Sequence, residues 1–186
     1  MTKWHEKSFV KFLLLTFAFA AVYALNNSLT SSLRLVPGAH LVHIPSGIKL
    51  VMVLIFEFIG ALSIGTVSLL AGLFYFFPES PSVSIELAIA NAMSPFLTLK
   101  LLMAGSTFDE WIENLTKAKL IAMGLVFACL NSALNQLVIY WNGLTDDILS
   151  GLEVMFIGDI TGVYITLTLL KLVSHFFKSD CPPSPE

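Results

Sequence analysis

The sequence predicts an all-α fold, a polytopic membrane helix bundle with about six transmembrane helices. Of the 186 residues, 56% are apolar and 12% are charged, and the mean hydropathy is +0.82. Soluble domains are about 45–50% apolar and about 25% charged. The apolar residues also form long runs that short polar breaks separate. These observations exclude a soluble globular domain and predict a bundle that faces lipid.

The first helix is expected over residues 12–25, an apolar run that follows Lys3, Lys7 and Lys11. A basic start before an apolar run also fits a cleavable signal peptide. Because the run is almost long enough to cross a membrane, we interpret it as a retained helix.

Residues 28–47 are too irregular for a simple span and predict an extracytoplasmic or re-entrant connection. Pro37, Pro45 and Gly47 restrict or shape the backbone in ways that a free linker does not need. We therefore expect an ordered cap over the bundle. The cap carries Arg34, His40 and His43.

Residues 48–77 are almost continuously apolar, which permits one long helix or two spans joined at residues 57–60 (Glu-Phe-Ile-Gly). The rule that cytoplasmic loops are rich in Lys and Arg favours two spans. A turn at Gly60 leaves only Arg34 and Lys49 on the outer side. It places the other lysines on the inner side: Lys3, Lys7, Lys11, Lys100, Lys117, Lys119, Lys171 and Lys178.

The remaining spans are each long enough to cross about 30 Å of hydrocarbon at about 1.5 Å per residue. We expect the six helices to form a single domain, residues 1–177, in the inner (cytoplasmic) membrane. An even number of spans places both termini in the cytoplasm. A Pro-rich cytoplasmic tail, residues 178–186, follows. The three tryptophans fall near span ends, as interface anchors do: Trp4, Trp111 and Trp141. The spans are residues 83–103, 119–140 and 148–172.

Several function classes have no support in the sequence. The net charge is −3 without a basic cluster, so nucleic acid is not an expected partner. Cys129 and Cys181 lie in surroundings too different to predict a disulfide. Gly-rich phosphate loops, Gly-x-Ser-x-Gly and His-Glu-x-x-His motifs are absent, so no catalytic residue is predicted and an enzyme is not the expected function. The sequence leaves the identity of any cofactor open. His40 and His43 lack a third ligand and are only a weak zinc signal.

Polar residues inside the predicted spans are the candidates for a site. A charged residue there costs about 2.5–3.5 kcal/mol, so Asp159 must be paired, hydrated or protonated. Lys49 is the first candidate for its partner, and Asn131 or Asn135 is the next.

The predicted fifth helix has one polar face. Asn131 and Asn135 lie four residues apart, as do Ser132 and Gln136, which together make a face about 140° wide. We expect this face to line a polar cavity. The alternative is that its amides only form hydrogen bonds that hold neighbouring helices together. The predicted ligand- or partner-binding site has Lys49 and the His40/His43 loop at its outer rim. It comprises Asp159, Lys49, Asn91, Asn131, Asn135, His40 and His43.

Two stretches carry a resemblance to a known family. Residues 43–48 (His-Ile-Pro-Ser-Gly-Ile) run into an apolar helix with Gly60 at its end. Residues 156–163 (Phe-Ile-Gly-Asp-Ile-Thr-Gly-Val) precede Thr-Leu-Thr-Leu, and residues 88–92 (Ala-Ile-Ala-Asn-Ala) lie between the two stretches. Over residues 37–172 this pattern resembles the first class of membrane-associated sensor domains.

The resemblance implies a multi-helix membrane sensor, a kind of module usually attached to a histidine kinase, diguanylate cyclase or phosphodiesterase domain. This chain departs from that pattern, with six predicted helices where the family commonly has about eight, and with a Pro-rich tail in place of an output domain. It would therefore act through a partner in trans.

Three functions remain open. The first is a sensory module that binds a small ligand or a partner helix. The second is a small transporter or its substrate-binding subunit, and the third is a structural accessory subunit. Expected partners are membrane lipid, a membrane protein or a second copy of this chain, and a small molecule.

Overall fold

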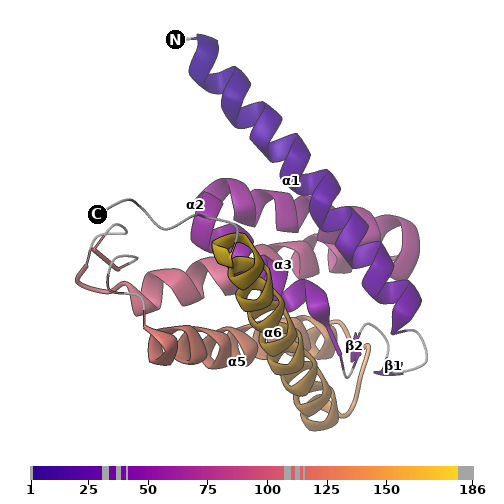
Figure 1. Cartoon of the computed structure of the whole chain (residues 1–186). Coiled ribbons are helices and arrows are strands. Elements are labelled where there is room, and N and C mark those ends of the chain that lie inside the picture. Colours follow the sequence, from indigo (N-terminus) through magenta and orange to yellow (C-terminus); the bar gives the residue numbers. More distant parts are fainter. Residues whose placement is uncertain are drawn as a thin grey trace, which may run out of the picture.

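In the computed structural model, the described residues are 2–30, 34–36, 39–40, 42–106, 110–111, 114 and 116–179. Their side chains are described for 7–30, 42–106, 110–111, 114 and 116–171. Five helices in this part of the chain are long and apolar enough to span a membrane, which makes the chain a multi-pass membrane protein. The helices are α1 (Thr2–Leu29), α2 (Ile44–Ala71), the π-helical turn η2 (Gly72–Phe76), α3 (Pro81–Leu102), α5 (Lys117–Trp141) and α6 (Ile148–Ser179) (Figure 1).

The helix ends follow local sequence signals. Pro81 begins α3, a position at which its missing N–H is not needed. The Thr116 side chain accepts a bond of 3.2 Å from the Lys119 N–H and caps α5. Helix α6 continues to Ser179, past the predicted end of the span, and the rest of the predicted tail lies outside the described residues.

A hairpin precedes α2. Strands β1 (Arg34–Val36) and β2 (Ala39–His40) pair antiparallel, and both contact α6. The paired strands and their contacts with α6 agree with the expectation of an ordered cap. Pro37, which was expected to shape it, and the side chains of Arg34 and His40 lie outside the described residues.

Helix α2 folds back on itself at Glu57, which is exposed and has φ 44° and ψ −119°. A Cβ added to Gly60 would lie 2.4 Å from the Met52 carbonyl oxygen. In a straight helix, residues eight positions apart are about 12 Å apart along the axis. The predicted break at residues 57–60 is therefore confirmed.

Contacts between the helices give their directions. Helices α3 and α5 are antiparallel, since Glu86 bonds Asn142 and Ser94 bonds Asn131. Helices α5 and α6 are also antiparallel, with contacts from Gly124 to Val163 and from Gly151 to Gln136. The first arm of α2 runs parallel to α6, and the second arm runs antiparallel to α3. The contacts that define these arms are Gly47–Thr166 and His43–Gly158, then Gly65–Ala92 and Gly72–Ser84.

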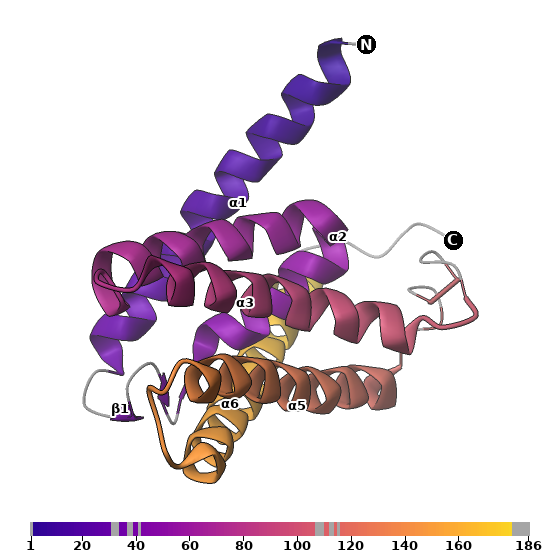
Figure 2. The ribbon, with the colours of Figure 1, turned by 180° about the vertical axis from the view of Figure 1, so that it is seen from behind.

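Helix α1 lies against the second arm of α2 and runs parallel to it. Its first turns, before Phe12, stand clear of the other helices in both views (Figure 1, Figure 2). Its contact with the bundle includes buried Phe19 and a bond of 3.3 Å from Ser63 Oγ to the Phe12 carbonyl. The chain therefore changes direction at each segment, and the start of α1, the α3–α5 connection and the end of α6 share one end of the bundle.

The first arm of α2 is short. Residues 44–56 span about 20 Å, less than the roughly 30 Å of a hydrocarbon core. The arm starts beside Gly158, which is ten residues, or roughly 15 Å, into α6. The expectation of about six transmembrane helices is thus corrected to five long helices in the described part of the chain. One of these, α2, is folded into a short first arm and a longer second arm.

The apolar core corrects one further expectation. Trp111 is 4% exposed and packs in the same buried cluster as Met103 and Met123, so it does not anchor the chain at an interface. Trp141 is 87% exposed, as an anchor should be. The side chain of Trp4 lies outside the described residues.

Candidate functional site

The start of α2 crosses α6 with the two backbones in contact. A Cβ on Gly162 would lie 1.8 Å from the His43 carbonyl oxygen, and one on Gly47 would lie 2.2 Å from Thr166 Oγ1. The His43 N–H donates to the Gly158 carbonyl at 3.2 Å. The two stretches that carry the resemblance, Pro-Ser-Gly and Gly-Asp-x-x-Gly, therefore form one contact.

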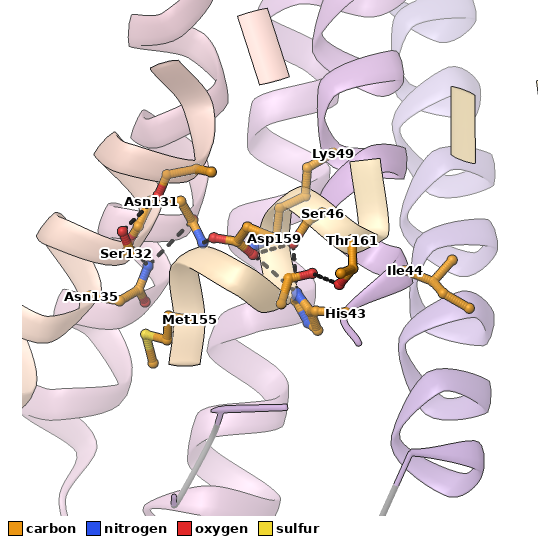
Figure 3. A network of polar contacts seen from close by, with 12 residues as sticks. His43, Ile44, Ser46, Lys49, Asn131, Ser132, Asn135, Met155, Asp159 and Thr161 are labelled. Atoms are coloured by element: carbon orange, nitrogen blue, oxygen red, sulfur yellow. Dashed lines mark hydrogen bonds and ion pairs between the residues drawn. The ribbon is translucent and has the colours of Figure 1, made fainter. Parts of the chain in front are cut away.

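Asp159 lies at this crossing and is 2% exposed. Ser46 Oγ donates to its Oδ1 and Asn131 Nδ2 donates to its Oδ2 at 2.7 Å, while His43 Nδ1 lies 3.5 Å from Oδ1 (Figure 3). The N-terminus of α2 adds a favourable helix dipole for a carboxylate. The prediction that Asp159 points into the bundle and meets a donor is confirmed.

Lys49 is also 2% exposed, but its ammonium donates to Asn91 Oδ1. Among the described side chains, the cation-forming group within 4 Å of the Asp159 carboxylate is His43. The first predicted partner of Asp159, Lys49, was wrong, and the next candidate, Asn131, was right. The physical reason is the depth at which α2 begins, because its first turn occupies the space beside Asp159 and Lys49 lies beyond it, toward α3.

Amide side chains link the two charged residues. Asn91 Nδ2 donates to Asn135 Oδ1 at 3.1 Å, Asn135 Nδ2 lies 3.3 Å from Asn131 Oδ1, and Asn131 donates to Asp159. The predicted polar face of α5 does look into the bundle, since Asn131, Ser132, Asn135 and Gln136 are all buried. A continuous polar chain thus joins α2, α3, α5 and α6.

The polar chain borders a cavity of about 80 Å³. Six predicted site residues line it, whereas the side chain of the seventh, His40, lies outside the described residues. Lys49 lines the interior and does not sit at an outer rim. The other lining residues are Tyr23, Ser68, Gly72, Phe76, Phe77, Leu87, Ile139 and Met155.

Sequence reasoning missed two groups. Ser46 was part of the Pro-Ser-Gly stretch, so that motif was a signal for its role beside Asp159. Tyr23 and Phe76, which form one wall, lie in long apolar runs with other aromatic residues and carried no comparable signal.

The arrangement of His43, Ser46 and Asp159 differs from a hydrolytic triad. In a triad, the two imidazole nitrogens bridge the serine and the acid. Here the same nitrogen, His43 Nδ1, faces Ser46 Oγ at 2.6 Å and Asp159 Oδ1 at 3.5 Å. The Ser46 hydroxyl donates to the carboxylate, so this geometry holds a buried charge and does not prepare a nucleophile.

Comparisons with protein-family models, with curated proteins and with solved structures found no match to this chain. The resemblance to the first class of membrane-associated sensor domains stays a prediction. In the described part of the chain, no three His, Cys, Asp or Glu side chains come together in a way that would hold a metal ion.

Proposed function

We propose that this chain is a membrane-embedded binding module that holds a small molecule in the central cavity and reports its presence to a partner membrane protein. The observation that supports this most strongly is the placement of two buried charged residues, Lys49 and Asp159, along one cavity. The sensor domains that the sequence resembles favour signalling to a partner.

The energetic argument sets binding against a purely structural role. Even a buried pair of opposite charges can often be replaced by well-packed apolar residues with a neutral or stabilising effect of about 1–4 kcal/mol, and Lys49 and Asp159 do not form a direct pair. A bundle that needed only stability would therefore fill this space with apolar side chains. Retaining Lys49, Asp159 and the amides between them around a cavity favours recognition of a polar group.

The distribution of lysines supports an orientation for the module. Lys7 and Lys11 lie near the start of α1, Lys100 near the end of α3, and Lys117 and Lys119 at the start of α5, all at one end of the bundle. Under the positive-inside rule this end is cytoplasmic. Both termini are then cytoplasmic, and the cavity opens toward the outer half of an inner membrane.

Small-molecule transport is the second candidate function, and the shape of α2 favours it. A short first arm that begins at the depth of the site, with its N-terminus at Asp159, resembles the discontinuous helices that form substrate sites in transporters. Non-helical backbone at this depth is tolerated where it is covered by protein or lines a cavity.

Filling the cavity tests the proposed binding function. In Leu87→Trp the larger ring occupies the cavity, while Ile89→Trp is the matched control, because Ile89 is 58% exposed on the same helix. The purified proteins are measured by native mass spectrometry before and after an organic extract of the host membranes is added. We expect a saturable bound mass in the wild type and in Ile89→Trp that Leu87→Trp lacks.

Two outcomes would change this view. If the wild type shows no bound mass, or if Leu87→Trp retains the same bound mass as the wild type, the binding function is contradicted. A bound molecule that also crosses proteoliposomes containing the purified protein alone would favour transport over signalling to a partner.

A further inference from the structure

We infer that the ligand is an uncharged amphiphile with an oxygen-bearing head group, which reaches the cavity from the bilayer between α1 and η2. This inference rests on the proposed binding function and adds the chemical class of the ligand and its route. Three observations carry it: the unused donors of Lys49, the balance of charge in the cavity, and a second hollow beside the cavity.

Lys49 provides the contact for the head group. An ammonium has three N–H donors, and among the described residues only Asn91 accepts one of them. The side chain is 2% exposed and lines the cavity, so bulk water does not readily satisfy the others. Asp159, in contrast, already accepts from Ser46 and Asn131. The cavity therefore presents donors and favours an acceptor oxygen.

The charges of the cavity select against an ionic ligand. Lys49, Asp159 and His43 are the residues lining the cavity that can carry a charge near neutral pH, and with a neutral His43 the ammonium and the carboxylate balance each other. An uncharged ligand preserves this balance. An anion or a cation adds a charge without a counter-ion in a site of low dielectric, which is unfavourable.

The second hollow provides the route and the place for an apolar tail. It measures about 470 Å³ and lies between α1 and η2. Apolar Ala24 and Ala71 and the Tyr75 ring line most of it, and Asn27 and Ser28 line its end near the C-terminus of α1. Tyr23 and Phe76 line both this hollow and the central cavity. Their rings meet edge to face, with centroids 6.5 Å apart, and so form the wall between the two spaces.

This wall is formed by side chains of two separate elements. Tyr23 is in the C-terminal half of α1, which packs on the bundle, while the first turns of this helix stand clear of it (Figure 2). Phe76 is on the π-helical turn, a kind of irregularity that is frequent at functional sites. An uncharged amphiphile dissolved in the bilayer can enter between these elements, place its oxygen near Lys49 and leave its tail beside Tyr75.

A photoreactive decanol with a diazirine near the end of its tail tests the inference on the full chain in phosphatidylcholine nanodiscs. We expect saturable labelling that mass spectrometry maps to Tyr23, Tyr75 or Phe76. Unlabelled decanol should compete, while decane, decanoate and decylamine should compete more weakly by about tenfold, because each lacks the acceptor or unbalances the charge. These competitions use the wild-type protein.

Two lysine variants locate the head group. Lys49→Met should weaken labelling by about tenfold, as expected for a lost hydrogen bond to a charged group. Lys100→Met is the matched control, because Lys100 is an exposed lysine near the end of α3, and it should label like the wild type. Equal labelling of Lys49→Met, stronger competition by decanoate or decylamine, or competition by decane equal to that by decanol would overturn the inference.

The two proposals fail in different ways. One outcome is that native mass spectrometry detects the mass of a bound molecule that Leu87→Trp lacks, while labelling by the photoreactive decanol does not saturate. This outcome would support the binding function and reject an uncharged amphiphile as the ligand. Absence of that mass and of saturable labelling would reject both.

Discussion

The N-termini of α2 and α6 both need hydrogen-bond acceptors for their first backbone N–H groups, and the acceptors come from different parts of the chain. In α6, Asp147 accepts from the Ser150 N–H at 3.1 Å and from the Ser150 hydroxyl, so a local pair caps the helix in an exposed loop. In α2, the His43 side chain makes no capping bond to the backbone. Asn26 of α1 instead accepts from the Ile44 N–H at 3.0 Å, and Asp159 of α6 accepts from Ser46.

The α6 cap is made by residues close together in the sequence, whereas the α2 cap depends on tertiary contacts. The α6 cap fixes where one helix begins and remains accessible to water. The α2 cap ties three helices together at the depth of the cavity, because its partners come from α1 and α6. A carboxylate beside a helix N-terminus thus serves as a local cap in one place and as the centre of a site in the other.

The largest expected effect comes from separating the backbones that this buried cap holds together. Gly162→Ala puts a Cβ 1.8 Å from the His43 carbonyl oxygen, so the start of α2 must move. We expect a loss of about 3 kcal/mol or more in the free energy of unfolding, measured by unfolding in mixed micelles.

Gly65→Ala is the control for that change. Its Cβ would meet Ala92 Cβ at 3.1 Å, and alanine gains about 1 kcal/mol of helix propensity over glycine. The net effect should be small. A Gly162→Ala protein as stable as the control would show that α2 does not depend on its contact with α6.

The second prediction separates the two charged residues of the cavity. Asp159→Ala leaves the donors of Ser46 and Asn131 unpaired, which should cost about 3 kcal/mol. Lys49→Met leaves Asn91 Oδ1 without its donor, which should cost about 1 kcal/mol.

The double variant decides whether the two charges act as a direct pair. We expect it to be at least as unstable as Asp159→Ala alone, because Lys49 and Asp159 make their hydrogen bonds to different residues. Thermal unfolding in detergent measures all three proteins. Recovery of stability in the double variant would indicate direct coupling, the behaviour of a buried pair in which removing one partner is worse than removing both.

Much of the fold was predictable because hydropathy and lysine placement are properties of single segments. The long helices, the turn at residues 57–60 and the inward direction of Asp159, Asn131 and Asn135 all follow from the energy of polar groups in hydrocarbon. The partner of Lys49 was not predictable in this way. Which group an inward side chain meets depends on how deep α2 begins, and that depth is set by Gly47 and Gly162 across two distant segments.

The smallest expected effect is at the exposed α6 cap. Hydrogen bonds from the Ser150 side chain, then from the Ser150 backbone, hold the pKa of Asp147 below its usual value of 3.8. A carboxylate with a depressed pKa contributes stability that is present above its unfolded pKa and is lost as the pH falls through the folded pKa. Asp147→Ala should therefore slightly lower the melting temperature at neutral pH. The difference in melting temperature between Asp147→Ala and the wild type should narrow below about pH 4.

Thermal unfolding from neutral to acidic pH, with Asp146→Ala as the neighbouring control, measures this difference in melting temperature. A pH-independent gap would mean that the Asp147 charge contributes nothing to the cap, and the contrast between the two helix N-termini would then reduce to a contrast in packing.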